Sequence, residues 1–385
     1  MKIRLSVSSL TGILILFFLF GANRLFAQKL KRHDKHVIIG YVGGYHGLYD
    51  STMVDPAKLT IINYAFVGVR NNRAYLGKEK TDTINFRHLL ELKRTNPNLR
   101  VLISIGGWGG SRYFSDAVLT DTARAGFAAS AVDIVRKYNL DGVDIDWEYP
   151  DDIGAGNIYR PEDKHNYTLM FEQLRLDLDT LQKQTGRKMY LTAAVGGFSR
   201  FLKQTEMGDA SKYLDYVSLM TYDLAQDSLH TIMHHTNLFA SKGYRTFCSA
   251  DLAVRDFEAA GVPANKLLVG IAFYGHTFTV ADSATTILGA RRSPVNVRGG
   301  GSGYTFIKDS LINRKGFKYY RDRAAKAPYL YNAVTRQFVT FDDEWSVRNK
   351  CRYVNQHGLA GVMFWEYAND KKEYLLKEID KDLVY

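Results

Sequence analysis

Eight short apolar runs, mostly separated by stretches of helical periodicity, constrain the fold of this chain more than any other feature. The runs are rich in Val, Ile and Leu, as is typical of parallel strands covered on both faces. They lie at residues 37–43, 59–67, 100–106, 142–148, 189–195, 216–221, 266–273 and 361–365. The amphipathic stretches lie at residues 86–94, 120–137, 163–184, 231–238, 250–260 and 345–357. Eight strand–helix repeats predict an α/β fold, a (β/α)8 or TIM barrel, over residues 36–385.

The interval between the seventh and eighth runs is too long for a single crossover helix. Within it, residues 329–332 and 337–341 have the pattern of a β-hairpin. We therefore predict that residues 274–340 form a small α+β insertion between strands seven and eight. The glycine-rich segment 299–303 lacks the Lys-Ser/Thr pair of a phosphate-binding loop, so we interpret it as an ordinary loop.

The fourth run carries the most informative chemistry. In the segment 141–150, DGVDIDWEYP, the side chains of a strand alternate between two faces. Asp144, Asp146 and Glu148 then share one face, and the other face is apolar. Carboxyls at alternate positions lie roughly 6–7 Å apart, so their charges repel and at least one pKa should rise. A carboxyl that stays protonated near neutral pH can act as a general acid.

Two other interpretations of this row of acids fit the residues less well. A solvated acidic face is inconsistent with the Val, Ile and Trp that alternate with the acids. A calcium loop of the EF-hand type requires Gly at its sixth position and Glu at its twelfth, whereas counting from Asp144 gives Tyr149 and Ala155. We therefore interpret the row as catalytic.

Several distinctive residues occupy the C-terminal ends of other predicted strands, where the active sites of such barrels lie. Residues 104–108 end the third run, residues 220–223 end the sixth, and Trp365 ends the eighth, while Tyr41 lies on the first. Their joint placement predicts a single functional rim.

These segments resemble the signatures of family 18 glycoside hydrolases, the chitinase family. The two motifs of that family are matched by SxGG at residues 104–107 and by DGxDxDxE at residues 141–148. Residues 220–223 (MTYD) and 361–366 (GVMFWE) are similar to further segments of the family. Order and spacing agree from about residue 36 to the C-terminus.

The resemblance implies a retaining, substrate-assisted hydrolysis of β-1,4 bonds between N-acetylglucosamine units. Glu148 would protonate the glycosidic oxygen and then act as a base toward water, while the acetamido oxygen of the substrate attacks the sugar. Asp146 would accept the acetamido N–H, and Asp144 would share a proton with Asp146. Tyr222 would donate to the acetamido oxygen. The implied catalytic residues are thus Glu148, Asp146, Asp144 and Tyr222.

The resemblance also implies substrate-binding roles. Trp365 would form the floor beneath the sugar, and Met220 and Asp223 would line its pocket. Tyr41 and Ser104 would steady Asp144. The full set expected to bind substrate is Tyr41, Phe66, Ser104, Gly107, Trp108, Tyr149, Met220, Asp223 and Trp365. For Phe66 and Trp108, packing is an equally good explanation.

The expected substrate is chitin or chitooligosaccharides, with no cofactor and no metal. Adjacent histidines, His234 and His235, suggest an ion site, but neighbours in sequence rarely face one ion and no third ligand is evident. The family often has Arg where this chain has His276, which leaves the preferred substrate length open. An endo-β-N-acetylglucosaminidase acting on N-glycans and a chitin-binding lectin are alternatives. Such lectins typically lack the catalytic acid, whereas Glu148 is present.

The N-terminus has the pattern of a secretory signal. Lys2 and Arg4 precede an apolar run at residues 10–22 that is too short to span a bilayer comfortably. We predict a signal peptide over residues 1–27 and a secreted, periplasmic or extracellular protein, with an uncleaved anchor as the alternative. After removal of the signal we expect a monomer with no membrane partner.

Charge and cysteine content add little to this assignment. The net charge is +11, but the basic residues are scattered, so nucleic acid is not an expected partner. The chain has two cysteines, Cys248 and Cys351, which we predict to be buried free thiols.

Overall fold

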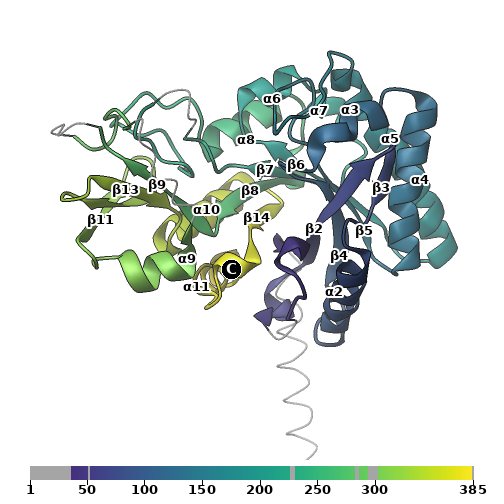
Figure 1. Ribbon diagram of the computed structural model, residues 1–385, viewed down its shortest axis with the longest axis horizontal. Helices are drawn as coiled ribbons and strands as arrows, with labels where there is room; N and C mark the ends of the chain where they lie inside the picture. The colour runs from purple at the N-terminus through teal and green to yellow at the C-terminus, as the bar shows by residue number, and fades with distance from the viewer. Residues whose placement is uncertain (1–35, 51–52, 226–229, 282–285, 294–301, 384–385) are drawn as a thin grey trace, which may run out of the picture.

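A parallel barrel of eight strands forms the centre of the computed structural model, which describes residues 36–50, 53–225, 230–281, 286–293 and 302–383 (Figure 1). The strands are β1 (Val37–Gly43), β2 (Ile61–Arg70), β4 (Arg100–Gly106), β5 (Gly142–Asp146), β6 (Tyr190–Gly196), β7 (Tyr216–Met220), β8 (Leu267–Ala272) and β14 (Gly361–Trp365). Each is parallel to its neighbours, and β1 pairs with both β14 and β2, which closes the barrel. A short strand, β3 (Arg73–Tyr75), extends β2 as a hairpin. The predicted TIM barrel is confirmed.

Helices surround the barrel. The long ones are α2 (Glu79–Glu91), α4 (Asp121–Lys137), α5 (Asp163–Thr185), α8 (Ala250–Ala259), α10 (Glu344–His357) and α11 (Tyr374–Leu383). Shorter helices are α3 (Phe114–Ala117), α6 (Ser199–Lys203) and α7 (Met207–Ala210). Side-chain caps at Thr120, Ser249 and Asp343 begin α4, α8 and α10, within two residues of the predicted starts.

The segment 231–238 is not a helix, contrary to the prediction. Its backbone groups bond to other parts of the chain: the N–H of Ile232 donates to Ala290, the N–H of Leu238 donates to Ala325, and the carbonyl of His235 accepts from Leu224. The apolar side chains that suggested a helix are buried by these contacts. Tertiary pairing has replaced the local helical hydrogen bonds.

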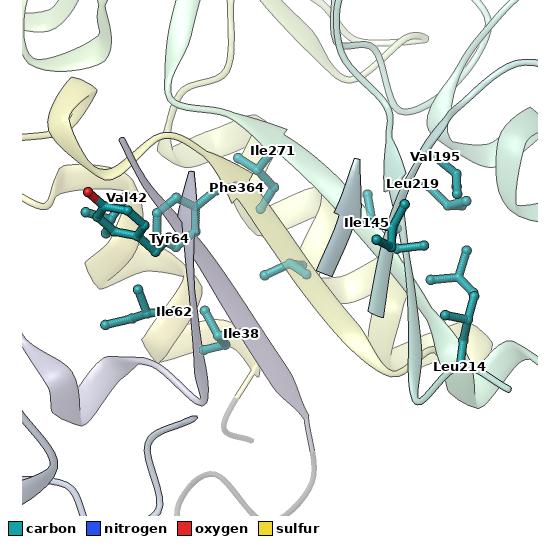
Figure 2. Close-up of a cluster of buried hydrophobic side chains, with 14 of the residues drawn as sticks. Ile38, Val42, Ile62, Tyr64, Ile145, Val195, Leu214, Leu219, Ile271 and Phe364 are labelled. Carbon is teal, nitrogen blue, oxygen red and sulfur yellow. The ribbon is translucent and has the colours of Figure 1, made fainter. Parts of the chain in front are cut away.

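Two apolar layers explain why the strands are nearly continuous in Val, Ile and Leu. The outer layer lies between the strands and the helices, and Figure 2 labels some of its residues, among them Ile38, Ile145 and Phe364. The inner layer fills the barrel with Ile39, Leu102 and other side chains that point the opposite way. A strand that is buried on both faces does not alternate between apolar and polar residues.

The insertion between β8 and β14 forms a second sheet of five antiparallel strands, which lies at one end of the molecule in Figure 1. Its order is β10 (Ser302–Gly303), β9 (Tyr274–Thr279), β13 (Gln337–Phe341), β12 (Ala327–Asn332) and β11 (Phe317–Asp322). A short helix, α9 (Tyr304–Phe306), and a π-helical turn (Ile307–Leu311) accompany it. The predicted α+β insertion is confirmed, and its predicted hairpin is β12–β13. Residues 299–301 of the glycine-rich segment lie outside the described residues.

Candidate active site

Asp144 is the innermost of the three acids and is held by side chains from three other strands. It receives hydrogen bonds from Tyr41 Oη (2.9 Å) and Ser104 Oγ (2.7 Å) at Oδ2, and from Thr192 Oγ1 (2.6 Å) at Oδ1. Ser104 and Thr192 are its register partners on β4 and β6. Complete burial raises the pKa of Asp144, although the hydroxyl donors favour the charged form and oppose the rise.

Asp146 ends β5 and is buried, but its carboxylate is not fully paired. Its Oδ1 has no hydrogen-bond partner among the described residues. Burial raises its pKa well above the ordinary value, and the charges of Glu148 and Asp144 raise it further. A buried carboxylate oxygen without a partner is costly unless a donor reaches it.

Glu148 lies two residues beyond the end of β5, so the strand is shorter than the predicted run. Its backbone N–H donates to Ser111 Oγ at 2.8 Å, which fixes the start of the loop. Burial raises the pKa of Glu148 to about 7, with a hydrogen bond from Tyr149 opposing the rise and the charge of Asp223 adding to it. Such a carboxyl is partly protonated at neutral pH and can exchange a proton with a bound molecule.

The row of acids therefore has raised pKa values, as the sequence predicted, but the main cause differs. The prediction rested on repulsion between like charges. In the structure, burial is the largest cause for Asp144, Asp146 and Glu148, and charge repulsion comes second for Asp146. The desolvation of a site inside a barrel cannot be read from the spacing of acids along one strand.

The glycines of the SxGG motif let two loops approach each other closely. Gly106 has a φ of 115°, and a Cβ there would lie 2.1 Å from the carbonyl oxygen of Asp146. The N–H of Gly107 donates to that same carbonyl at 2.8 Å. Any side chain at Gly106 would push away the end of β5, so this glycine positions the acids.

The acids open into a cavity of about 1140 Å³. Nine of the predicted site residues line it: Phe66, Trp108, Asp146, Glu148, Tyr149, Met220, Tyr222, Asp223 and Trp365. Four others, Tyr41, Ser104, Gly107 and Asp144, are not among its lining residues and are buried behind its wall. Tyr41 and Ser104 contact Asp144 there, so their geometry is that of supports for the acids.

Aromatic rings form one wall of the cavity. Trp365 packs against Phe66, with ring centroids 5.5 Å apart and an interplanar angle of 18°, and against Tyr41 at 5.6 Å. Trp108 is 55% exposed and contacts Tyr149 edge-on at 6.4 Å. Flat apolar faces beside carboxylates suit the binding of sugar rings, which combine apolar faces with hydroxyl groups.

Tyr222 and Asp223 bring the end of β7 to the same cavity. Among the described residues, the Tyr222 hydroxyl donates only a long contact, 3.6 Å, to Met363 Sδ. Asp223 has a φ of 56° and accepts hydrogen bonds from Tyr274 Oη (2.7 Å) and from His276 Nε2 (2.6 Å). Burial would raise the pKa of Asp223, but hydrogen bonding with His235 and His276 outweighs it and holds that pKa well below its usual range.

The two adjacent histidines do face different partners, as expected. His234 Nε2 lies 3.4 Å from Asp322 Oδ2, whereas His235 Nδ1 lies 3.6 Å from Asp223 Oδ1. Asp223 and His276, which the sequence did not connect with His235, place potential ligand atoms within 4.8 Å of a ring nitrogen of His235. Burial lowers the pKa of His235 to about 4, so its ring is neutral at pH 7.

Several residues of the site were not singled out from the sequence. Ser111 begins a 3-10 turn after β4 and Tyr274 begins β9 of the insertion, and no local pattern marks either residue. Thr192 had a usable signal, because it is the one aliphatic hydroxyl in the largely apolar strand β6 (YLTAAVG). Cys248 also differs from its prediction. Both cysteines are free, but only Cys351 is buried, and Cys248 is partly exposed and lines the cavity just before α8.

The barrel and its row of acids beneath a sugar-sized cavity define a glycoside hydrolase, and the comparisons identify its family. The model for glycosyl hydrolases family 18 matches residues 37–370, so the chain belongs to that family. Chitinase A1 of Niallia circulans is 35% identical over 91% of this chain and 59% of its own length. The chain thus spans less than two thirds of that relative. Endochitinase 1 of Metarhizium robertsii is 32% identical over 86% of this chain and 80% of its own length.

Solved structures agree with this assignment. A family 18 N-acetylglucosaminidase from Paenibacillus barengoltzii superimposes with a TM-score of 0.83 at 40% identity and covers 90% of this chain and 100% of its own. A Group IV chitinase from Ostrinia furnacalis gives a TM-score of 0.81 at 26% identity, over 91% and 100% of the two chains. The fold is thus shared with enzymes of known structure over about nine tenths of this chain.

Proposed function

We propose that this enzyme is a chitinase that cleaves β-1,4 bonds between N-acetylglucosamine units with retention of configuration. The observation that carries the proposal is Asp146, which lines the cavity together with Glu148 and whose buried Oδ1 lacks a partner among the described residues. An acetamido N–H from the sugar is the complementary donor. Two relatives named as chitinases, at 35% and 32% identity, support the substrate class.

Glu148 acts as the general acid in the first step. With a pKa of about 7 it holds a proton at neutral or weakly acidic pH. It gives this proton to the glycosidic oxygen as the bond from that oxygen to the anomeric carbon breaks, so the leaving sugar departs neutral. The deprotonated Glu148 then takes a proton from water in the second step.

The sugar supplies its own nucleophile. Its acetamido oxygen attacks the anomeric carbon from the face opposite the leaving group and forms an oxazolinium ion, which water opens to a β-product. Asp146 accepts the acetamido N–H and so holds the oxygen in line, and its charge stabilises the cation. An attacking group held in this way has an effective concentration of roughly 10⁵ M or more.

The remaining residues shape the site. Tyr222 donates to the acetamido oxygen, since its hydroxyl has only a long contact to sulfur in the free enzyme. Trp365 is the floor, Phe66, Trp108, Tyr149, Met220 and Asp223 line the groove, and Asp144 exchanges a proton with Asp146. In this proposal residues 36–385 are the catalytic domain, and residues 274–340 are the insertion that forms one side of the groove.

We propose that the enzyme is exported by a signal peptide at residues 1–27, which lie outside the described residues, and works as a monomer without cofactor. No helix in the described part of the chain is long and apolar enough to cross a membrane. Release of single sugars is a second candidate function, because one similar structure is titled an N-acetylglucosaminidase.

A timed product profile tests these functions together. Chitin oligomers of several lengths and a high-mannose glycopeptide are incubated with the enzyme and sampled early. A chitinase releases short oligomers from the chitin series and leaves the glycopeptide intact. Release of the monomer alone would favour the N-acetylglucosaminidase, and cleavage of only the glycopeptide would contradict the proposed substrate.

A further inference from the structure

Three potential metal ligands from separate segments converge at the edge of the cavity. Asp223 follows β7, His276 lies on β9 of the insertion, and His235 belongs to the segment 231–238. Their carboxylate oxygen and ring nitrogens all lie within 4.8 Å of one another. His276 Nε2 is 2.6 Å and His235 Nδ1 is 3.6 Å from the same oxygen, Asp223 Oδ1.

We propose that Asp223, His235 and His276 bind a divalent transition-metal ion, for which Zn²⁺ is the best match. Two imidazoles and one carboxylate are a ligand set that Zn²⁺ uses with a water at its fourth position. Mg²⁺ and Ca²⁺ prefer sites built from oxygen atoms, so two nitrogen donors select against them.

The geometry requires little rearrangement. Tetrahedral zinc with bonds of about 2.0–2.1 Å separates neighbouring donors by roughly 3.3 Å. The His235–Asp223 distance of 3.6 Å is already close to this value. His276 has to draw back slightly from Asp223, and its side chain, 34% exposed, has room to do so.

The surroundings of the three ligands also suit an ion. The Tyr274 hydroxyl donates to Asp223 at 2.7 Å and orients its carboxylate, as the outer partners of metal ligands do. His235 is fully buried, and its Nδ1 is an acceptor that receives only a long contact, 3.4 Å, from the backbone N–H of Asp223, which an ion could replace. Asp223 is 57% exposed and lines the cavity, which gives the ion a path of entry.

A bound ion would occupy the edge of the space in which the sugar binds. Asp223 lines the same cavity as Glu148 and Trp365. Zinc at this site therefore competes with substrate. This competition rests on the proposed function, whereas the binding of zinc does not.

Metal binding is tested by calorimetric titration of the untagged full chain with ZnCl2, and by the visible spectrum of the Co²⁺ form. We expect one ion per chain with tetrahedral Co²⁺ bands. His276→Gln should weaken binding at least tenfold, a loss of the order that even outer partners cause. This variant is preferred to one at the buried His235, because the side chain of His276 is partly exposed.

The matched control is His165→Gln on α5. His165 Nδ1 lies 3.0 Å from Glu206 Oε2, so it pairs with one carboxylate but belongs to no three-ligand group among the described residues. The His165→Gln variant should bind zinc with the affinity of the wild type. Equal affinity in the wild type and His276→Gln, or no binding by the wild type, would overturn the proposal. If zinc binds at this site but does not raise the apparent KM for chitooligosaccharides, the proposal that zinc competes with substrate is wrong.

Discussion

The hydroxyl of Thr192 donates a hydrogen bond of 2.6 Å to Asp144 Oδ1, deep in the barrel where both side chains are fully buried. The other carboxylate oxygen, Oδ2, accepts hydrogen bonds from Tyr41 and Ser104. Three strands thus complete the hydrogen bonding of one acid. This support lets Asp144 remain beside Asp146 without a cation, because hydroxyl dipoles stabilise its charged form.

Thr192→Val keeps the shape of this side chain and removes its hydroxyl. We expect the free energy of unfolding to fall by about 1–3 kcal/mol, since a buried carboxylate oxygen loses its donor. Urea unfolding followed by tryptophan fluorescence measures the change. Thr192→Ser is the matched control, because it keeps the donor. If both variants unfold alike, the hydrogen bond does not support Asp144.

Glu148→Gln removes the proton donor and keeps the volume. We predict that kcat falls by about 10²- to 10⁴-fold, the usual contribution of a general acid, while binding of chitooligosaccharides persists. Steady-state kinetics and calorimetry measure the two effects. Glu162→Gln, at an exposed carboxyl that precedes α5, should leave both unchanged. A Glu148→Gln enzyme with substantial turnover would show that the acid is misassigned.

Asp146→Asn removes the negative charge beside the acetamido group. An amide can still accept the N–H, but it stabilises the developing cation less, so kcat should fall by roughly 10²- to 10³-fold with a smaller change in KM. Initial rates on a chitin oligomer test this expectation. A rise in KM with kcat unchanged would mean that Asp146 contributes only to substrate binding and not to the transition state.

The pH dependence of kcat/KM follows from Glu148. Its pKa is raised to about 7, so the carboxyl is protonated below that pH and loses its proton above it. A general acid works only when protonated, and kcat/KM should therefore fall about tenfold per pH unit above pH 7. Rates measured from pH 5 to 9 at constant ionic strength, with stability checked at each pH, test the sign. A rate that rises through pH 7 would contradict the role.

The barrel and the acids were predictable because their signals are local. Runs of Val, Ile and Leu report strands covered on both faces, and the period of two in the segment 142–148 places the acids on one face. The segment 231–238 misled the same reasoning, since Ile232 and Leu238 have their backbone partners at residues 290 and 325. Local periodicity cannot reveal that backbone groups have hydrogen-bond partners so far away along the chain.

The rest of the site depends on contacts between distant segments. His276 meets Asp223 only because the insertion returns β9 to the edge of the barrel, and Ser111 reaches Glu148 through the turn after β4. How far the pKa of each acid rises depends on its burial, which cannot be read from the spacing of the acids. Cys248 illustrates the same limit, because its exposure is set by the cavity beside α8.

The central claim is that the sugar provides the attacking oxygen while Glu148 provides the proton. It is tested most directly by the kcat of aryl chitobiosides whose N-acetyl group at the cleaved sugar carries zero, one, two or three fluorine atoms. Fluorine withdraws electrons from the acetamido oxygen, so the account predicts a steep, progressive fall in kcat across the series. A kcat that is unchanged across the four substrates would contradict it, because attack by a protein carboxylate or by water does not use that oxygen.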